Sequence, residues 1–472
     1  MRYILNLLCD AIVYKQTIMS FTIPKKLANY SKDAISVQSM VDITPTFTRL
    51  VPMNSSSTTT YTSAANNRIT FRIPSFQNTF MDNSRSFISY KYTNTTAGLP
   101  AVGTARTQNS KKADWSGSVF NSITVRSSNG VIIQQTDNAH VLSKLFKLMD
   151  VREETALSCE GDYSYATSAA DKLLVANSQE TTKTYTMKMD YGVFSQYLKS
   201  YLPLHLLGTT FALDLELHLS PPEECMEITN AFAGLTPSYS LTDVAFNLAL
   251  LEVSPEICKK FDQVACDEND AVIIPFQTYS NHTSTQNSQS QVHFISEAAT
   301  SLSAVYVAIL ENQQTFADRS IPLKFLGGAN TTTENERLES YQLQVGNRHI
   351  YNEPVLSLST DNNESMQHLK NSLYNQRYPM FVEKRAPGTV LSRYESGSNF
   401  MIGSTMTFSE ESNHNTDQGI STGGLPLKLS IKMRAGGQNL TVQSFCKLGY
   451  NLVIKRGQAN YVEINDFSRK SY

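Results

Sequence analysis

The two carboxylates of the triplet Asp214-Leu215-Glu216 have the clearest potential for chemistry in this sequence. Residues two apart in a strand point to the same face, so both carboxyl groups would lie side by side. Retaining glycosidases use two carboxyl groups about 5 Å apart beside a sugar-binding cleft. The neighbouring sequence offers no third carboxylate and no aromatic-rich groove. We therefore favour a solvated polar face over an active site.

Other motifs for metal or phosphate chemistry are weak. The acidic run DEND at 267–270 lacks the alternating ligands and turn glycine of a calcium loop, so a solvated linker is the better interpretation. The eight histidines show neither HxH nor HExxH spacing. Glycine pairs at 423–424 and 436–437 flank a strand and indicate turns. We expect no catalytic residue, no cofactor and no metal site.

The cysteines point in the same direction. They are scattered, with no CxxC motif and no paired histidine, which favours free thiols in a reducing compartment over disulfides or zinc ligation. The six positions are Cys9, Cys159, Cys225, Cys258, Cys266 and Cys446.

Length and composition indicate a β-rich protein with two domains. A chain of 472 residues exceeds what one hydrophobic core usually serves, so two domains of about 200 residues are expected. Only 17% of residues are charged, and 23 Tyr and 22 Phe accompany a single Trp, a balance that favours strands and polar loops over surface helices. The net charge of −2 argues against a basic nucleic-acid-binding module.

Residues 1–65 are expected to form an N-terminal arm, because they are polar and only weakly periodic. The apolar run at 3–13 is too short to span a bilayer and contains Asp10. Met19 begins a stretch typical of a soluble N-terminus, so we expect residues 1–18 to be an upstream extension. A poor signal peptide is the alternative.

Alternating apolar and polar residues predict a series of strands in the first half of the chain. Asn129-Gly130 can supply the two positive-φ residues of a tight hairpin turn, and Asp137-Asn138 can cap a helix of about three turns. A short amphipathic helix is expected at 194–201. The strands are expected at 68–74, 86–92, 123–127, 131–135, 184–189, 211–219 and 241–251.

The second half repeats this order of elements without repeating the sequence. Long polar loops at 152–182 and 375–420 occupy equivalent places in the two halves. A chance recurrence of strand-rich segments is the alternative interpretation. The matching segments are strands at 291–296, 304–310, 341–345, 425–433 and 440–454, a hairpin through 346–351 and a helix at 361–374.

The segment LTDVAFNLALLEVSPEICKKF at 241–261 marks the boundary between the halves. Its strand pattern stops at Pro255, which removes a hydrogen-bond donor, and the residues after it predict a short helix. Phe246 and Leu248 are expected to face a core. This order of short strands and long connections predicts an all-β fold of two tandem eight-stranded jelly rolls with short helices in the loops. The expected division is an arm at 1–65, a first roll at 66–254, a connector at 255–270, a second roll at 271–457 and a tail at 458–472.

With this organisation, the chain resembles the double jelly-roll major capsid proteins of icosahedral double-stranded DNA viruses. That lineage includes adenovirus hexon, virophages, Polinton-like viruses and giant viruses. The resemblance spans about residues 66 to 454 and rests on the order and duplication of several segments. They are ITFRI with SFISYKY, SITVRSSNGVII followed by HVLSKLF, YLPLHLLGTTFALDLELHLS, and the boundary segment itself.

The resemblance implies a structural role in the virion. Such proteins form homotrimers whose six rolls give a pseudo-hexameric capsomer, and capsomers tile an icosahedral shell, often over an internal membrane. It also implies penton and minor capsid proteins as partners, synthesis in the cytoplasm of an infected host cell, and no sequence-specific nucleic-acid binding. The alternatives are a glycan-binding jelly-roll surface protein and a minor or vertex capsid component.

Overall fold

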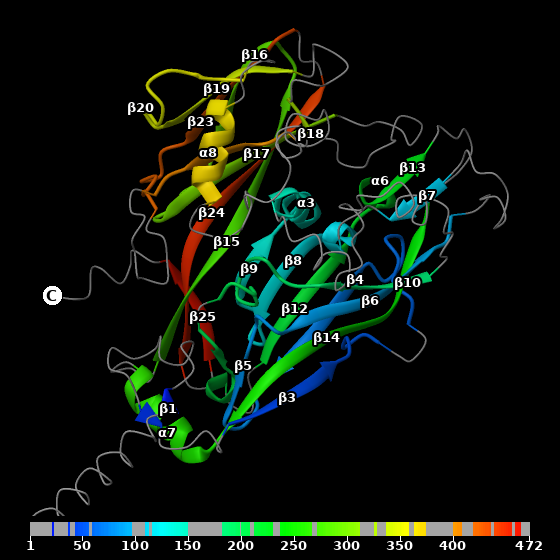
Figure 1. Ribbon diagram of the computed structural model, residues 1–472, viewed down its shortest axis with the longest axis vertical. Coiled ribbons are helices and arrows are strands. Elements are labelled where there is room, and N and C mark those ends of the chain that lie inside the picture. The colour runs from blue at the N-terminus through cyan, green and yellow to red at the C-terminus, as the bar shows by residue number, and fades with distance from the viewer. Residues whose placement is uncertain are drawn as a thin grey trace, which may run out of the picture.

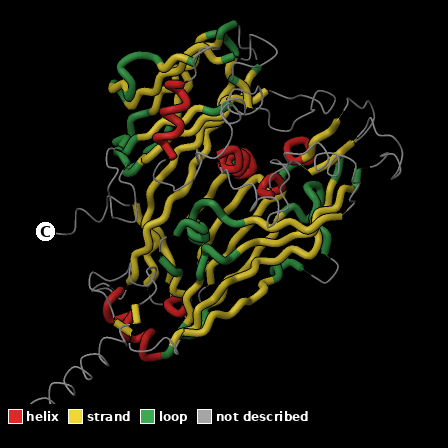
Figure 2. The backbone as a smooth tube through the Cα atoms, in the orientation of Figure 1, coloured by secondary structure: helices red, strands yellow, loops and turns green. Residues whose placement is uncertain are grey.

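The computed structural model shows a molecule built mainly from strands, with a few short helices at their borders (Figure 2). The residues that the structure describes are 21–22, 36–37, 43–55, 59–96, 109–112, 116–149, 182–198, 200–207, 212–229, 237–266, 271–311, 325–327, 337–357, 363–373, 400–407, 419–435, 439–455 and 458–463.

The first roll consists of two antiparallel sheets. Counted along the roll, the first strand pairs with the last, the last with the third and the third with the sixth, while the second, seventh, fourth and fifth form the facing sheet. This is the strand order of an eight-stranded jelly roll. The eight strands are β3 (Ile43–Leu50), β4 (Arg68–Pro74), β6 (Phe87–Asn94), β8 (Phe120–Ser127), β9 (Ile132–Thr136), β10 (Thr182–Met187), β12 (Ala212–Leu219) and β14 (Tyr239–Val253).

The second roll repeats the same pairing order. The expectation of two tandem eight-stranded jelly rolls is therefore confirmed (Figure 1). The eight strands of the second roll are β15 (Ala271–Gln286), β16 (Ser290–Ile295), β17 (Leu302–Glu311), β19 (Leu338–Val345), β20 (Arg348–His349), β22 (Ile402–Thr405), β23 (Leu427–Met433) and β24 (Leu440–Lys455).

Shorter elements complete the described part of the chain. Two helices follow the fifth strand of their roll, α3 in the first and α8 in the second, as the sequence predicts. These elements are β1 (Phe21–Thr22), β2 (Ser36–Val37), β5 (Thr79–Met81), β7 (Asn109–Lys112), η2 (Ser116–Val119), α3 (Ala139–Met149), β11 (Leu202–Pro203), η4 (Leu204–Leu207), α6 (Pro222–Cys225), β13 (Met226–Thr229), α7 (Pro255–Ala265), β18 (Phe325–Leu326), β21 (Val355–Leu356), α8 (Asn363–Leu373) and β25 (Gln458–Glu463).

Side-chain alternation builds the core of each roll. In β12 the three leucines at 213, 215 and 217 have no exposed surface, and they face β14, where Phe246 and Leu248 are also buried. Phe246 contacts the rings of Phe71 and Phe194 edge to face, at centroid distances of 6.0 and 5.8 Å. The expectation that Phe246 and Leu248 face a core is therefore confirmed, because both lie between the sheets.

The connector begins as expected. Ser254 caps α7 by accepting a hydrogen bond from the backbone N–H of Ile257, and Pro255 occupies the first turn, where it loses no helical hydrogen bond. The helix continues to Ala265, one turn beyond the expected end at Phe261. It lies at the end of the molecule where the two rolls join (Figure 1).

Regular structure starts earlier and ends later than the sequence suggested. The strand β3 (Ile43–Leu50) lies within the stretch assigned to the arm, yet it pairs with β14 along its whole length. The strand β25 (Gln458–Glu463) lies within the stretch assigned to the tail and pairs with β24. The domain limits at 66–254, 255–270 and 271–457 stay a prediction. Of the two long loops expected at 152–182 and 375–420, residues 152–181 and 375–399 lie outside the described residues. The prediction of a continuous loop at 375–420 was wrong, because the strand β22 (Ile402–Thr405) lies within it and pairs with β17.

Two local predictions were wrong. Only Gly130 has a positive φ in the first hairpin, because Ser127 to Gly130 form a turn closed by the Gly130 N–H on the Ser127 carbonyl, 2.8 Å away. A three-residue loop with a glycine bulge replaces the expected two-residue turn. The described part of 194–201 forms turns rather than a helix.

The two rolls share a packed junction around α3 (Figure 1). Tyr279 of β15 meets Phe146 of α3 and Tyr191 of the first roll, each at a centroid distance of 5.4 Å. The ammonium of Lys144 lies 4.7 Å from the ring centre of Phe325 in β18. Asn138 donates to the Asn281 side chain across the same junction, at 2.8 Å. Aromatic and polar contacts therefore fix one roll against the other.

Candidate functional site

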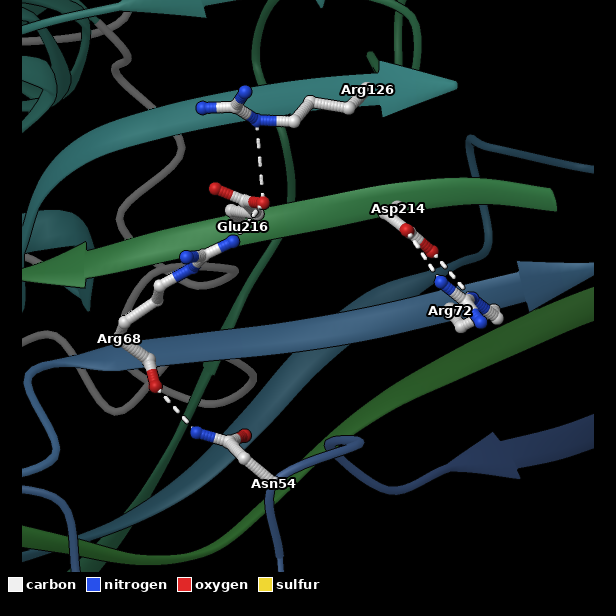
Figure 3. A network of polar contacts seen from close by, with 6 residues as sticks. All are labelled: Asn54, Arg68, Arg72, Arg126, Asp214 and Glu216. Carbon is white, nitrogen blue, oxygen red and sulfur yellow. Dashed lines mark hydrogen bonds and ion pairs between the residues drawn. The ribbon is translucent and has the colours of Figure 1, made fainter. Parts of the chain in front are cut away.

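The carboxylates of Asp214 and Glu216 lie on the outer face of the sheet β4-β12-β8-β9, as the strand pattern predicts (Figure 3). Arg72 donates from Nε and from Nη2 to the two carboxylate oxygens of Asp214, both at 2.9 Å. This hydrogen bonding and the charge of Asp214 raise the pKa of Arg72 above its ordinary value. Such a fork-to-fork pair fixes both side chains in one plane.

Glu216 is enclosed by two guanidinium groups (Figure 3). Arg68 donates to its Oε1, and the Nε of Arg126 lies 3.3 Å from the same oxygen. The Glu216 side chain is only 4% exposed, so the two arginines cover it. Asn54 in turn holds the backbone carbonyl of Arg68, at 2.7 Å. We call this surface, made by Arg68, Arg72, Arg126, Asp214 and Glu216, the charged face.

The charged face lacks the arrangement that sugar hydrolysis requires. A retaining glycosidase needs one carboxyl group as nucleophile and one as acid, both open to the substrate. Here Asp214 is engaged by a bidentate guanidinium, and Glu216 is covered from both sides. The arrangement supports the interpretation of a polar sheet surface over that of an active site.

The second roll carries a face with the same hydrogen-bond register and different chemistry. Asp214 of β12 lies between Arg72 and Arg126 on the neighbouring strands. At the equivalent place, Lys428 of β23 lies between Phe294 of β16 and Gln344 of β19. The central strand of this face therefore presents lysine where the first roll presents aspartate, and a phenylalanine replaces an arginine beside it.

Large apolar side chains are exposed on the edge strand of one sheet in each roll. Phe47 of β3 is 70% exposed, and Val51 and Met53, just beyond this strand, are also exposed. Phe294 of β16 is 64% exposed and has Val292 on the same face. Both β3 and β16 pair on one side only within the described residues. We call these surfaces the β3 strip (Phe47, Val51, Met53) and the β16 strip (Val292, Phe294).

Two clusters in the structure combine histidine, cysteine and carboxylate side chains. No local sequence motif indicated either cluster. One consists of His205, Cys258 and Asp262, and the other of His282, Glu297 and Cys446. In each cluster the potential ligand atoms lie within 4.8 Å of one another. In each cluster at least one member lies far from the others in the chain, so no local spacing rule could have found the complete set.

The second cluster is hydrogen-bonded within the second roll, where His282 and Glu297 are partly exposed and Cys446 is buried. Glu297 accepts from Ser280 and contacts the Nε2 of His282 at 2.8 Å. The thiol of Cys446 has no exposed surface, and burial, followed by the charge of Glu297, raises its pKa. On the neighbouring strand β16, His293 contacts the hydroxyl of Ser284 at 2.8 Å and the side-chain oxygen of Gln286 at 2.5 Å, both of which belong to β15.

The remaining chemical expectations concern thiols, membranes and the acidic run. The described cysteines, Cys225, Cys258, Cys266 and Cys446, form no disulfide, as expected. Among the helices that the structure describes, none has the length and apolar character to cross a bilayer. The acidic run at 267–270 lies outside the described residues, as does the glycine pair at 436–437.

Comparisons with known proteins identify the fold. No protein-family model and no curated protein sequence matches the chain. The PBCV-1 virus capsid structure superposes with a TM-score of 0.57 at 7% identity, covering 92% of this chain and 100% of that one. The Sputnik virophage structure gives 0.55 at 12% identity, covering 93% and 98%. The mavirus major capsid protein gives 0.51 at 11% identity, covering 93% and 95%.

These likenesses extend over both rolls, because each covers more than nine tenths of the chain. At such low identities they concern the fold and not the individual side chains. The resemblance drawn from the sequence is confirmed at that level: this chain has the double jelly-roll fold found in the mavirus major capsid protein and the PBCV-1 and Sputnik structures.

Proposed function

We propose that this protein is the major capsid protein of an icosahedral double-stranded DNA virus and that its role is structural rather than enzymatic. The observation that carries the proposal is the duplicated jelly roll, present in one chain and matched over its length by viral capsid structures. Three copies supply six rolls, which suits a position of sixfold symmetry in a shell. The paired and covered carboxylates of the charged face also support a non-enzymatic role.

The two apolar strips support assembly of the chain with itself. A closed ring of identical subunits needs two different surfaces on each copy, so that each surface meets the other on the next subunit. The β3 strip belongs to the first roll and the β16 strip to the second. We assign these strips to the contact between neighbouring chains, where burial would remove their apolar side chains from water.

Sedimentation of the purified full-length chain tests the proposal. The expected species is a trimer, and negative-stain images of it should show particles of hexagonal outline. A stable monomer at micromolar concentration would overturn the proposal. An assembly of five chains would favour a vertex component instead, although a vertex protein is expected to contain a single roll.

The finer features of the role are part of the same proposal. Capsomers of this protein would contact each other, penton proteins and minor capsid proteins in the virion. Synthesis would take place in the cytoplasm of the infected cell. The rival function, a glycan-binding surface protein, predicts sugar binding by the isolated chain on a glycan array, whereas a capsid building block without receptor function predicts none.

A further inference from the structure

The junction between the two rolls joins the first strand of the second roll, β15, to the helix α3 of the first. Tyr279 of β15 is only 1% exposed, because it packs against Phe146 of α3 and against Tyr191. Two residues further along the strand, Asn281 accepts a hydrogen bond from Asn138, which immediately precedes α3. The junction therefore combines an aromatic contact with the helix and a polar contact at the start of the helix.

The first roll has a strand of the same kind in β3, but its outward face is exposed. This strand pairs with the last strand of its roll, as β15 does. Phe47 lies opposite Ala249, which alternates with two buried leucines of β14, so Phe47 points away from the core, as Tyr279 does. The Phe47 side chain is 70% exposed, and Arg49, two residues further along, is 52% exposed. The pattern of an aromatic residue followed by a polar one thus recurs on β3 without being covered.

The helix α8 of the second roll also differs in exposure from its counterpart α3. In α3 the side chains from 139 to 146 are buried, apart from that of Ser143, which is half-buried. In α8 the side chains of Glu364, Gln367 and Asn371 are exposed. These positions are three and four residues apart, so they form one stripe along the helix. The surface that α3 buries is therefore open on α8.

Charge and apolar surface both favour a contact between β3 and α8. Arg49 follows Phe47 on the strand, and Glu364 lies in the first turn of α8, which are the places where the junction has its polar contact. Each has a partner within its own roll and is still more than half exposed, at 52% for Arg49 and 57% for Glu364. Opposite charges facing each other across an interface favour the correct pairing of surfaces. Next to α8, the strand β21 offers Leu356, which is 48% exposed.

A second copy of the chain is the partner, because one chain cannot bring these two surfaces together. The strand β3 lies at the border of the first roll that is remote from the second roll, and α8 lies on the second roll far from β3 (Figure 1). In a closed ring, a surface on the first roll of each copy meets a different surface on the next copy. Such a ring provides the arrangement in which β3 can reach α8.

We propose that β3 of one chain packs against α8 of the neighbouring chain and so repeats, between copies, the contact that β15 makes with α3 within each chain. Phe47 packs along the stripe of Gln367 and Asn371, and Arg49 pairs with Glu364. The proposal rests on the capsid role, since it names the surface that meets the β3 strip in the ring. The β16 strip then meets a different part of the neighbouring chain.

Charge reversal in the full-length chain tests this contact. Arg49→Glu and Glu364→Arg should each raise the concentration at which half of the chains are trimeric by about tenfold or more, because each brings like charges together at every contact of the ring. The double variant restores an opposite-charge pair and should return to within about threefold of the wild type. Sedimentation at a series of concentrations measures assembly, and circular dichroism checks that each variant is folded.

Matched controls make the same changes at other exposed positions. Arg85→Glu reverses an arginine that is 66% exposed and pairs with an aspartate of its own roll, as Arg49 does. Glu256→Arg reverses an exposed glutamate in the first turn of α7, which matches the place of Glu364 in its helix. Both controls should assemble as the wild type does.

Cross-linking locates the partner of β3 directly. After oxidation with copper phenanthroline, the variant Phe47→Cys/Gln367→Cys should form a disulfide between chains. The variant Phe47→Cys/Phe294→Cys, which tests the β16 strip as the partner, should form none.

The outcomes separate this contact from the capsid role. A wild-type trimer that is insensitive to both charge reversals would overturn the contact alone, as would a link to position 294 without a link to position 367. Single variants that weaken the trimer without recovery in the double variant would also overturn it, because the two side chains would then not face each other. A monomeric wild type would overturn both the contact and the capsid role.

Discussion

The two rolls place the same strands in the same register, yet their outer sheet faces differ in chemistry. On the first roll, arginines from both flanking strands close over the carboxylates of β12. On the second roll, β23 presents Lys428, Ser430 and Lys432, and its edge neighbour β16 presents exposed Val292 and Phe294. One face satisfies its charges within the chain, whereas the other leaves apolar surface in water.

This difference shows how a duplicated fold can provide unlike surfaces from like backbones. Inward positions keep the core, because leucine, isoleucine or methionine fills them on β12 and on β23. Outward positions are free to diverge, since the sheet does not depend on them for packing. A ring of identical subunits needs such unlike surfaces, because each subunit contacts its two neighbours through two different surfaces.

The largest expected effect separates core positions from surface positions within the first roll. Phe246→Asp would place a carboxylate between the sheets, beside Phe71 and Phe194, at a cost of about 4 kcal/mol or more, so no folded protein should be recovered. Phe47→Asp makes the same chemical change at an exposed position and should give folded protein, as measured by circular dichroism. Normal trimers from Phe246→Asp would contradict the assigned core.

The next effect tests whether the charged face stabilises its roll. Glu216→Ala removes the carboxylate between Arg68 and Arg126 and should lower the free energy of unfolding by about 2 kcal/mol, a figure reduced for the partial exposure of both arginines. Ser430→Ala, at the equivalent register position of the second roll, should change it by less than about 0.5 kcal/mol. Equal losses in urea unfolding would remove the contrast between the faces.

A smaller effect is expected for assembly through the β16 strip. Phe294→Ser should weaken the trimer by about 1.5 kcal/mol per interface, because less apolar surface is buried, and should leave the fold intact. Arg72→Ser, at the same register position of the first roll, breaks the pair with Asp214 and should leave trimer dissociation unchanged. Sedimentation at a series of concentrations measures both. Weaker assembly in Arg72→Ser alone would assign the contact to the charged face.

The smallest effect concerns an inward position at which the rolls differ. Phe71 on β4 corresponds to His293 on β16, and burial lowers the pKa of His293 below its ordinary value of 6.5. Below pH 6.5 the unfolded chain binds a proton that the folded chain does not. The free energy of unfolding should therefore decrease as the pH is lowered from 6.5 to the pKa of His293 in the folded protein. His293→Gln should reduce this slope by at most one proton per chain, as measured by urea unfolding at several pH values.

Sequence patterns predicted the strands in which apolar and polar residues alternate regularly, among them the edge strands β10 and β16. They failed for the first strand of each roll, β3 and β15, for a physical reason. The strand β3 is rich in threonine and half exposed, and β15 contains Pro275 and a polar second half. Both lie at a sheet border or pair chiefly with one strand, where proline and polar residues cost little.

The candidate sites were predictable only where they lie along one strand. Asp214 and Glu216 were expected on one outer face, because two-residue spacing fixes that geometry. Their arginine partners come from two other strands, and His205 reaches Cys258 only after the first roll has closed onto the connector. Contacts of this kind depend on tertiary register, which apolar periodicity does not encode.

The pairing of the first strand with the last has a consequence for how the chain folds during synthesis. The sheet of β3 and β14 cannot form until residue 253 has left the ribosome, about 200 residues after β3 emerged. The second roll repeats this delay between β15 and β24. Such distant pairings slow folding and expose unpaired edges in the meantime. We therefore expect the nascent first roll to need protection from aggregation until its closing strand arrives, while the second roll is completed only near the end of translation.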